Sequence, residues 1–235
     1  MFESKSGVLL IAGLGFFLLA FLSNGLVPWL MYAGKKEQTV EEMIAAQVEQ
    51  RANALPPGRS TTIVTHFKEL REFYKESFIK AYGDPDAEKW DEPKWQEQCA
   101  KAVRAGHKVY VAEACWHCHS QFIRPVSREA DRWGPVSQNW EYNNELQKPV
   151  LFGTRRVGPD LSREGGRRSN DWHMVHFWRP RDTTPRSVMP EYPWFFDGDA
   201  GRPSERGLAI VTYMQFLGSW LDVYPHYTEE TSGRK

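Results

Sequence analysis

One five-residue run constrains this 235-residue chain more than any other feature of its sequence. The run Cys115-Trp116-His117-Cys118-His119 reads C-x-x-C-H, the pattern for covalent attachment of c-type haem. Two thiols at this spacing can bond to the two vinyl groups of one porphyrin, and the histidine that follows can ligate the iron. C-x-x-C also occurs in zinc sites and redox dithiols, and His117 and His119 would supply two imidazoles for zinc.

Charge and cysteine content exclude other classes of protein. The chain carries 30 Lys+Arg and 30 Asp+Glu, so its net charge of zero does not favour a nucleic-acid partner. It has three cysteines, and two of them belong to the motif, which is too few for a disulfide framework. We expect the third, Cys99, to be a small buried apolar residue.

The uncharged run Gly7–Tyr32 predicts a membrane helix. As a helix it is longer than the hydrocarbon core of about 30 Å, and Trp29 lies where an interfacial aromatic belt would be. The run is too long for a signal peptide and no A-x-A-like site follows it, so we expect a retained anchor in contact with lipid. Lys35 and Lys36 weakly favour a cytoplasmic carboxyl side. Haem c is attached outside the bacterial cytoplasm, however, and we give that argument precedence.

The chain divides into four expected segments. These are a membrane anchor (1–34), a polar helical insert or linker (35–92), a cytochrome c domain (93–222) and a carboxyl-terminal tail (223–235). A capping box formed by Thr39 and Glu42 opens a helix through about Asn53, and Pro56-Pro57-Gly58 then breaks the chain. A second helix is expected over 61–82, with an apolar side that could pack on the haem domain or on another subunit: Phe67, Leu70, Phe73, Tyr74 and Phe78.

Two further helices frame the expected haem domain. Residues 94–112 read as a helix that runs into the C-x-x-C-H motif, and residues 204–221 as a final helix with Ser204 as its N-cap. A helix before the motif and a helix at the end are what a small cytochrome c fold needs, because the two cross and shield one haem edge. The expected fold is therefore mainly α, a single amino-terminal transmembrane helix plus a cytochrome c-type haem domain.

Two downstream stretches add to the haem interpretation. In cytochromes c, a G-P-x-L turn such as Gly158-Pro159-Asp160-Leu161 passes beneath the haem, and its proline carbonyl accepts a hydrogen bond from the proximal histidine. Met189 lies between Pro185 and Pro190, where an extended loop can hold a thioether over iron. The other candidates for a sixth ligand are Met174, Met214, His173, His176 and His226.

Together these stretches resemble a known family. After the haem motif come His119-Ser120-Gln121-Phe122-Ile123-Arg124-Pro125, then the G-P-D-L turn, and finally Met189-Pro190-Glu191-Tyr192-Pro193-Trp194. Over residues 105–221 the chain resembles the membrane-anchored monohaem cytochrome c subunit (subunit II, CcoO/FixO-like) of cbb3-type cytochrome c oxidases. The resemblance implies one periplasmic haem c domain on the bacterial inner membrane. It also implies two partners, a haem–copper catalytic subunit and an electron donor, which would be another cytochrome c subunit or a soluble cytochrome c.

The resemblance also implies roles for individual residues. Cys115 and Cys118 make the thioethers, His119 and Met189 are the axial ligands, and Pro159 accepts the proximal hydrogen bond. Ser120, Gln121 and Arg124 would face the catalytic subunit or the haem edge. Between residues 120 and 206 there are thirteen Arg and one Lys, and guanidinium groups suit haem propionates. Arg124, Arg155 and Arg156 are the nearest candidates to the markers.

Three alternatives and one departure stay open. The chain could be the haem c subunit of a nitric oxide reductase-like complex, a membrane-anchored zinc-binding interaction module, or a haem-based sensor. No constellation for acid–base or nucleophilic catalysis is present, so we expect a non-catalytic electron-transfer subunit. The insert at 35–92 is longer than the link usual in the family. It would dock an extra subunit or replace contacts made elsewhere, and deletion of residues 40–90 would then disrupt assembly while leaving the haem in place.

Overall fold

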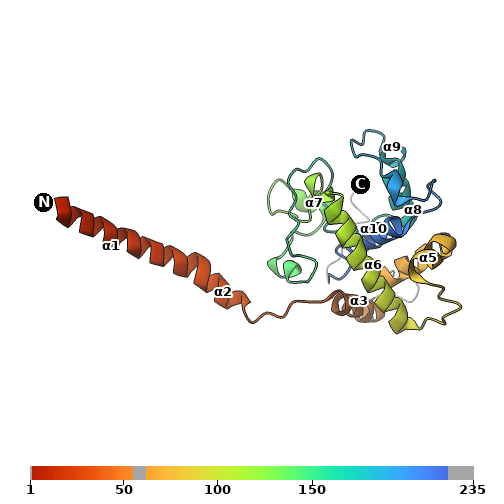
Figure 1. Cartoon of the computed structure of the whole chain (residues 1–235), viewed down its shortest axis with the longest axis horizontal. Coiled ribbons are helices and arrows are strands. Elements are labelled where there is room, and N and C mark those ends of the chain that lie inside the picture. Colours follow the sequence, from red (N-terminus) through yellow and green to blue (C-terminus); the bar gives the residue numbers. More distant parts are fainter. Residues whose placement is uncertain (1, 55–61, 222–235) are drawn as a thin grey trace. The chain divides into compact units, whose positions relative to one another are not determined.

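The chain separates into two compact units. A computed structural model describes residues 2–54 and 62–221, and its contacts divide the chain into Met1–Glu37 and Gln38–Lys235 (Figure 1). His226, the tail at 223–235 and the Pro56-Pro57-Gly58 breaker lie outside the described residues. From residue 38 on, the predicted insert and the predicted cytochrome c domain lie in the same compact unit.

The first unit is one apolar helical segment. It comprises α1 (Phe2–Phe21), a π-helical turn η1 (Leu22–Leu26) and α2 (Val27–Tyr32). Within it, Lys5–Tyr32 is long and apolar enough to cross a membrane. At the π-turn, the Asn24 side-chain amide donates to the Ala20 carbonyl at 3.1 Å, which satisfies a backbone acceptor inside the apolar segment. The segment fits a single-pass membrane anchor.

The second unit is built from helices. In chain order they are α3 (Val40–Ala54), α4 (Ile63–Phe73), α5 (Lys75–Tyr82), α6 (Glu92–Ala112), η2 (Cys115–His117), α7 (Glu129–Trp133), η3 (Asn139–Tyr142), α8 (Asn170–Trp178), α9 (Pro180–Thr183), η4 (Pro193–Phe195) and α10 (Glu205–Phe216). Over residues 2–54 and 62–221 the structure has isolated β-bridges but no strand. The mainly α fold with one amino-terminal anchor helix is confirmed.

The longest helix of this unit crosses the last one at a glycine. A Cβ added to Gly106 of α6 would lie 2.0 Å from the Ala209 carbonyl oxygen and 2.6 Å from the Tyr213 Cβ of α10. The backbones can approach this closely only because position 106 has no side chain. Val103 and Tyr110 flank the crossing and are fully buried. The predicted pairing of these two helices is therefore present, and Figure 1 shows α10 passing beside α6.

The insert packs against the same core. On α3, Gln47 is buried and donates its side-chain amide to the Ser219 carbonyl at 2.6 Å. On α4, the ring of Phe67 contacts Phe78 of α5 and Trp95 of α6, with centroids 4.9 and 6.1 Å apart. Two partners were considered for this apolar side, and the structure shows it packed on the segment of the same chain that leads into the C-x-x-C-H motif.

Three details of the predicted helices are wrong. The helix expected over 61–82 is broken at Tyr74, which leaves the helical conformation (φ −124°, ψ 47°) and donates its hydroxyl to Asp171 at 2.8 Å. The break turns α5 so that Phe78 packs on Phe67. Phe73, placed on the buried side by the sequence pattern, is 64 % exposed. Finally α10 ends at Phe216, because the Leu217 carbonyl turns away to accept from the Gly165 amide at 2.9 Å.

Candidate haem site

The C-x-x-C-H motif begins where α6 ends. Ala114 adopts a left-handed conformation (φ 55°), and the chain then makes the short helical turn η2. The His119 amide donates to the Cys115 carbonyl at 3.0 Å, so the turn brings the histidine back beneath the first cysteine. The two motif cysteines are not joined by a disulfide. Cys115 is buried, which raises its pKa to about 12, whereas Cys118 is exposed.

The histidine of the motif is held by the G-P-D-L turn. Nδ1 of His119 donates to the carbonyl oxygen of Pro159 at 2.9 Å, which leaves the lone pair of Nε2 free for a metal. A Cβ on Gly158 would lie 2.3 Å from Cε1 of the imidazole, so the turn touches the ring directly. Burial lowers the pKa of His119, and the bond to Pro159 opposes this effect. A neutral imidazole with one free nitrogen is the donor that haem iron requires.

The M-P-E-Y-P-W loop lies against the start of the motif. The Trp194 indole donates to Oε1 of Glu113, two residues before Cys115, at 3.2 Å. Burial raises the pKa of Tyr192, and the neighbouring thiol of Cys115 raises it further, which places that ring near the cysteines. Met189 precedes this contact and is half-buried against the core. The structure thus brings the methionine loop and the cysteine pair to one end of α6.

Four other candidates for a sixth ligand lie in the described part of the chain, and they contact the protein interior. Met174 and Met214 are 1 % and 4 % exposed and pack in the hydrophobic core. Nδ1 of His173 donates to the Ser169 carbonyl at 2.9 Å, and its Nε2 lies 3.4 Å from Glu164. Nδ1 of His176 lies 2.6 Å from the Thr183 hydroxyl, and burial lowers the pKa of this imidazole to about 4.

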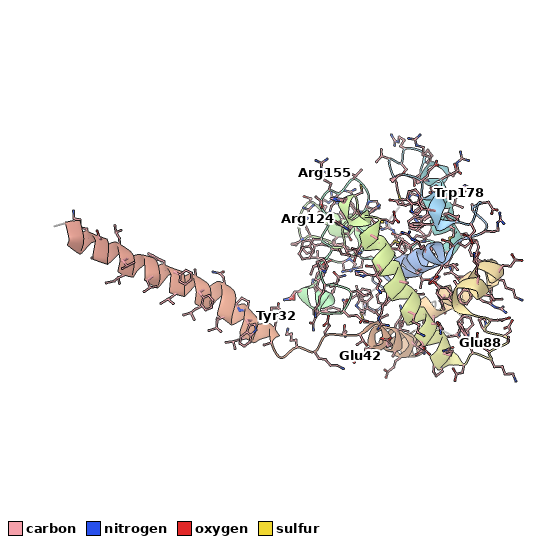
Figure 2. All side chains as sticks on the ribbon, viewed as in Figure 1. Tyr32, Glu42, Glu88, Arg124, Arg155 and Trp178 are labelled. Atoms are coloured by element: carbon pink, nitrogen blue, oxygen red, sulfur yellow. The ribbon has the colours of Figure 1, made fainter. Side chains whose placement is uncertain are left out.

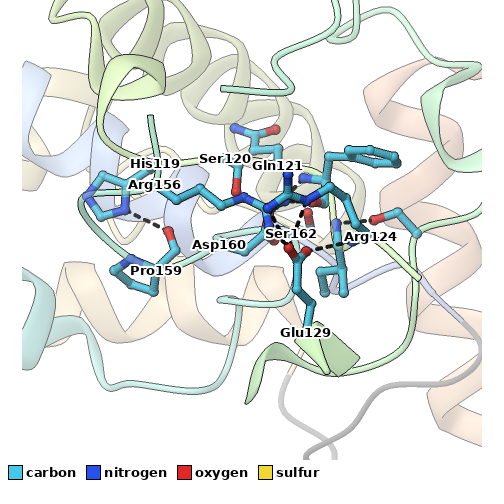
Figure 3. A network of polar contacts seen from close by, with 12 residues as sticks. His119, Ser120, Gln121, Arg124, Glu129, Arg156, Pro159, Asp160 and Ser162 are labelled. Carbon is cyan, nitrogen blue, oxygen red and sulfur yellow. Dashed lines mark hydrogen bonds and ion pairs between the residues drawn. The ribbon is translucent and has the colours of Figure 1, made fainter. Parts of the chain in front are cut away.

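Two of the three predicted arginines have a carboxylate partner within the protein. Arg124 and Arg156 both contact Glu129, whose side chain is 3 % exposed (Figure 3). Burial alone would raise the pKa of Glu129, but hydrogen bonds from the two guanidinium groups lower it to about 2. Arg155 is exposed and extends from the periphery of the unit (Figure 2). The structure therefore brings together two of the arginines around a buried acid and leaves the third facing outward.

The G-P-D-L turn also contains a buried aspartate to which the sequence assigns no role. Asp160, in the G-P-D-L turn, is 1 % exposed. Its Oδ2 accepts the Ser120 hydroxyl at 2.6 Å and the Phe122 amide at 2.8 Å, and Oδ1 accepts the Ser162 amide at 2.8 Å. In the sequence Asp160 reads as an ordinary turn residue, because its partners at 120 and 122 lie about forty positions away. Only the adjacent haem motif hinted at a role.

A family comparison agrees with this site. The family model described as the mono-haem subunit of cytochrome c oxidase, FixO, matches residues 98–206. Over those residues the chain is similar to the FixO mono-haem subunit. The matched region runs from the second turn of α6 to the start of α10 and contains the C-x-x-C-H motif, the G-P-D-L turn and the methionine loop. It supports a haem cofactor and implies a cytochrome oxidase complex. No curated protein matches the chain.

Proposed function

We propose that this FixO-like subunit carries one covalent haem c and relays single electrons to the oxygen-reducing subunit of a cbb3-type oxidase. The observation that carries the proposal is the hydrogen bond from His119 Nδ1 to the Pro159 carbonyl, at 2.9 Å. The bond fixes the orientation of the imidazole and leaves Nε2 free. Because His119 directly follows the second cysteine of the motif, that nitrogen is available to ligate a haem iron. The zinc alternative has less support, because no cluster of three or more His, Cys, Asp or Glu side chains suited to a metal occurs among the described residues.

Each residue has a defined task in this proposal. Cys115 and Cys118 form the thioethers, His119 supplies the proximal nitrogen and Pro159 holds the imidazole in one tautomer. Met189 supplies the distal sulfur, since it is the half-buried candidate on a loop outside the helices. The bound haem supplies a reversible one-electron couple, and methionine ligation raises its potential.

The proposal extends to location and partners. The anchor would hold the haem domain on the periplasmic face of the bacterial inner membrane. A donor cytochrome c would deliver electrons there, and a haem–copper subunit would receive them. The anchor is a single apolar helix, and the described part of the chain offers no other candidate span, so a large membrane partner is needed to house oxygen chemistry.

Mass and spectra of the purified protein test the cofactor. The intact mature chain should be about 616 Da heavier than its polypeptide, and a pyridine haemochrome spectrum should be that of haem c. The variant Met189→His should have a lower reduction potential and should lose a sulfur-to-iron charge-transfer band at about 695 nm. A colourless protein of unmodified mass contradicts the proposal, and an unchanged spectrum in the variant contradicts the role of Met189.

Turnover of the purified complex tests the oxidase. We expect O₂ consumption with reduced cytochrome c, and no comparable NO consumption. A complex that reduces NO and not O₂ would instead be a nitric oxide reductase. The copurifying subunits and the ratio of haem to polypeptide are measured on the same sample.

A further inference from the structure

Two hydrogen bonds in adjacent register join the haem motif to the G-P-D-L turn. His119 donates to the Pro159 carbonyl, and the next residue of each segment forms the second bond, from the Ser120 hydroxyl to the Asp160 carboxylate at 2.6 Å. The backbones are joined as well, by Gly158 N to Cys118 O at 2.9 Å and by Leu161 N to Ser120 O at 2.8 Å. The bond from His119 to Pro159 therefore belongs to a small ladder of backbone and side-chain hydrogen bonds.

The aspartate is the side chain that ties this ladder together. It accepts one hydroxyl and two amide hydrogens, from Ser120, Phe122 and Ser162, so both oxygens are occupied while it is 1 % exposed. A carboxylate accepts hydrogen bonds without donating, which matches three donors. Figure 3 shows it beside the guanidinium of Arg156, whose Nη2 lies 3.8 Å from Oδ2. The turn and the motif are thus joined through one carboxyl side chain.

We propose that Asp160 is a positioning residue that holds Pro159 against His119 and thereby sets the reduction potential of the haem. The inference rests on the proposed function, because it takes His119 as the proximal ligand. Two effects of the carboxylate act in the same direction. It keeps the Pro159 acceptor on Nδ1, which makes the imidazole a stronger donor to iron. Its negative charge also favours the more positive, oxidised centre.

The charge of Asp160 reaches the ring. Asp160 follows Pro159 directly and accepts from the residue after His119, so its carboxylate lies next to the group that binds the imidazole. Arg156 offsets part of this charge, but it is also paired with Glu129. The net expectation is that removing the Asp160 charge favours the reduced state.

Redox titration of the full-length, haem-loaded protein in detergent tests this inference. Asp160→Asn should move the midpoint to a more positive value, by about a tenfold change in the ratio of reduced to oxidised protein, which is about 59 mV for one electron. The control Asp131→Asn removes an exposed carboxylate of the same unit and should change that ratio by less than about twofold. The absorption band at about 695 nm should persist in both variants, because the distal ligand is unchanged.

A second variant separates positioning from simple stability. Ser120→Ala removes one donor and leaves the charge, so we expect a smaller shift in the same direction. Because Ser120 acts through Asp160, the double variant should match Asp160→Asn alone. A purely structural aspartate would lower the melting temperature without moving the midpoint.

Two results overturn the inference. One is a wild-type midpoint in haem-loaded Asp160→Asn. The other, decisive if that variant does not fold, is a wild-type midpoint in Ser120→Ala. Failure of the proposed function gives a different result from failure of this inference. In that case the wild-type chain itself lacks haem in the pyridine assay that precedes the titration.

Discussion

At the scale of single residues, the polar interior behind the haem motif depends on one guanidinium. Arg156 contacts Glu129, approaches Asp160 and donates to the Phe122 carbonyl, and its side chain is 16 % exposed. A buried acid that loses its counterion is costly, whereas an exposed arginine contributes little. The chain offers a direct comparison, because the exposed Arg155 is the preceding residue.

Arg156→Ala should therefore lower the free energy of unfolding by about 3 kcal/mol, the lower end for a broken buried pair, since Arg124 still contacts Glu129. Arg155→Ala should change it by less than about 0.5 kcal/mol. Urea denaturation followed by circular dichroism measures both. Equal losses in the two variants would contradict the assigned burial of Arg156.

Acid should weaken the same network. The pKa of Glu129 is about 2 in the folded chain, below its ordinary value of 4.5. The stabilisation from its charge is therefore complete above about pH 4.5 and is lost as the pH falls from there toward 2. Glu129→Gln should be less stable than wild type at pH 7, and the two melting temperatures should converge toward pH 3. The exposed control Glu72→Gln should follow the wild-type curve, and parallel curves for Glu129→Gln would disprove the assignment.

At the scale of helices, the crossing of α6 and α10 limits what position 106 can carry. Alanine favours a helix over glycine by about 1 kcal/mol, but here its Cβ would meet the Ala209 carbonyl oxygen at 2.0 Å. Gly106→Ala should nevertheless lower the free energy of unfolding by about 1–3 kcal/mol, the usual cost of overpacking. Lys108→Ala, exposed on the same helix, is the control. A melting temperature raised by Gly106→Ala would show that the helices do not cross here.

The insert is a structural part of the second unit. Its buried residues Ile44, Phe67 and Phe78 belong to the same hydrophobic core as Val103 and Tyr110 of α6. The expectation that a deletion of residues 40–90 leaves the haem in place therefore needs correction. Such a deletion would expose the core beside α6 and α10, and we now expect that fragment to unfold and to lose its haem.

Two phenylalanines on α4 give a sharper test of the insert. Phe67 is fully buried and Phe73 is 64 % exposed. Phe67→Ala should cost about 3–5 kcal/mol of unfolding free energy, as core truncations do, whereas Phe73→Ala should have little effect on the isolated subunit. Chemical denaturation of the purified chain measures both. A small loss of unfolding free energy in Phe67→Ala would contradict the packing of the insert in the core.

At the scale of the whole molecule, the anchor and the second unit are separate compact bodies. Replacing residues 1–37 by a cleavable export signal should give a water-soluble, red fragment with the melting temperature of the haem-loaded parent. Ultracentrifugation and an absorption-monitored melt check this. A fragment that sediments with membranes, or that melts well below the parent, would show that the second unit depends on its anchor.

Local patterns in the sequence were sufficient for much of this protein. An uncharged run identified the anchor, and Thr39 with Glu42 marked the start of α3 by a capping box that the structure contains. The C-x-x-C-H spacing led to the haem interpretation and to the family. Such features can be predicted from sequence because the interactions that produce them join residues only a few positions apart.

Tertiary structure alone decided the rest. The break at Tyr74, the exposure of Phe73 and the end of α10 depend on partners far along the chain, such as Asp171 and Gly165. So do the hydrogen bonds of Asp160, whose donors at 120 and 122 lie close to it only once the motif and the turn have paired. Burial and long-range hydrogen bonds depend on which segments come together in space, and a short sequence window does not contain that information.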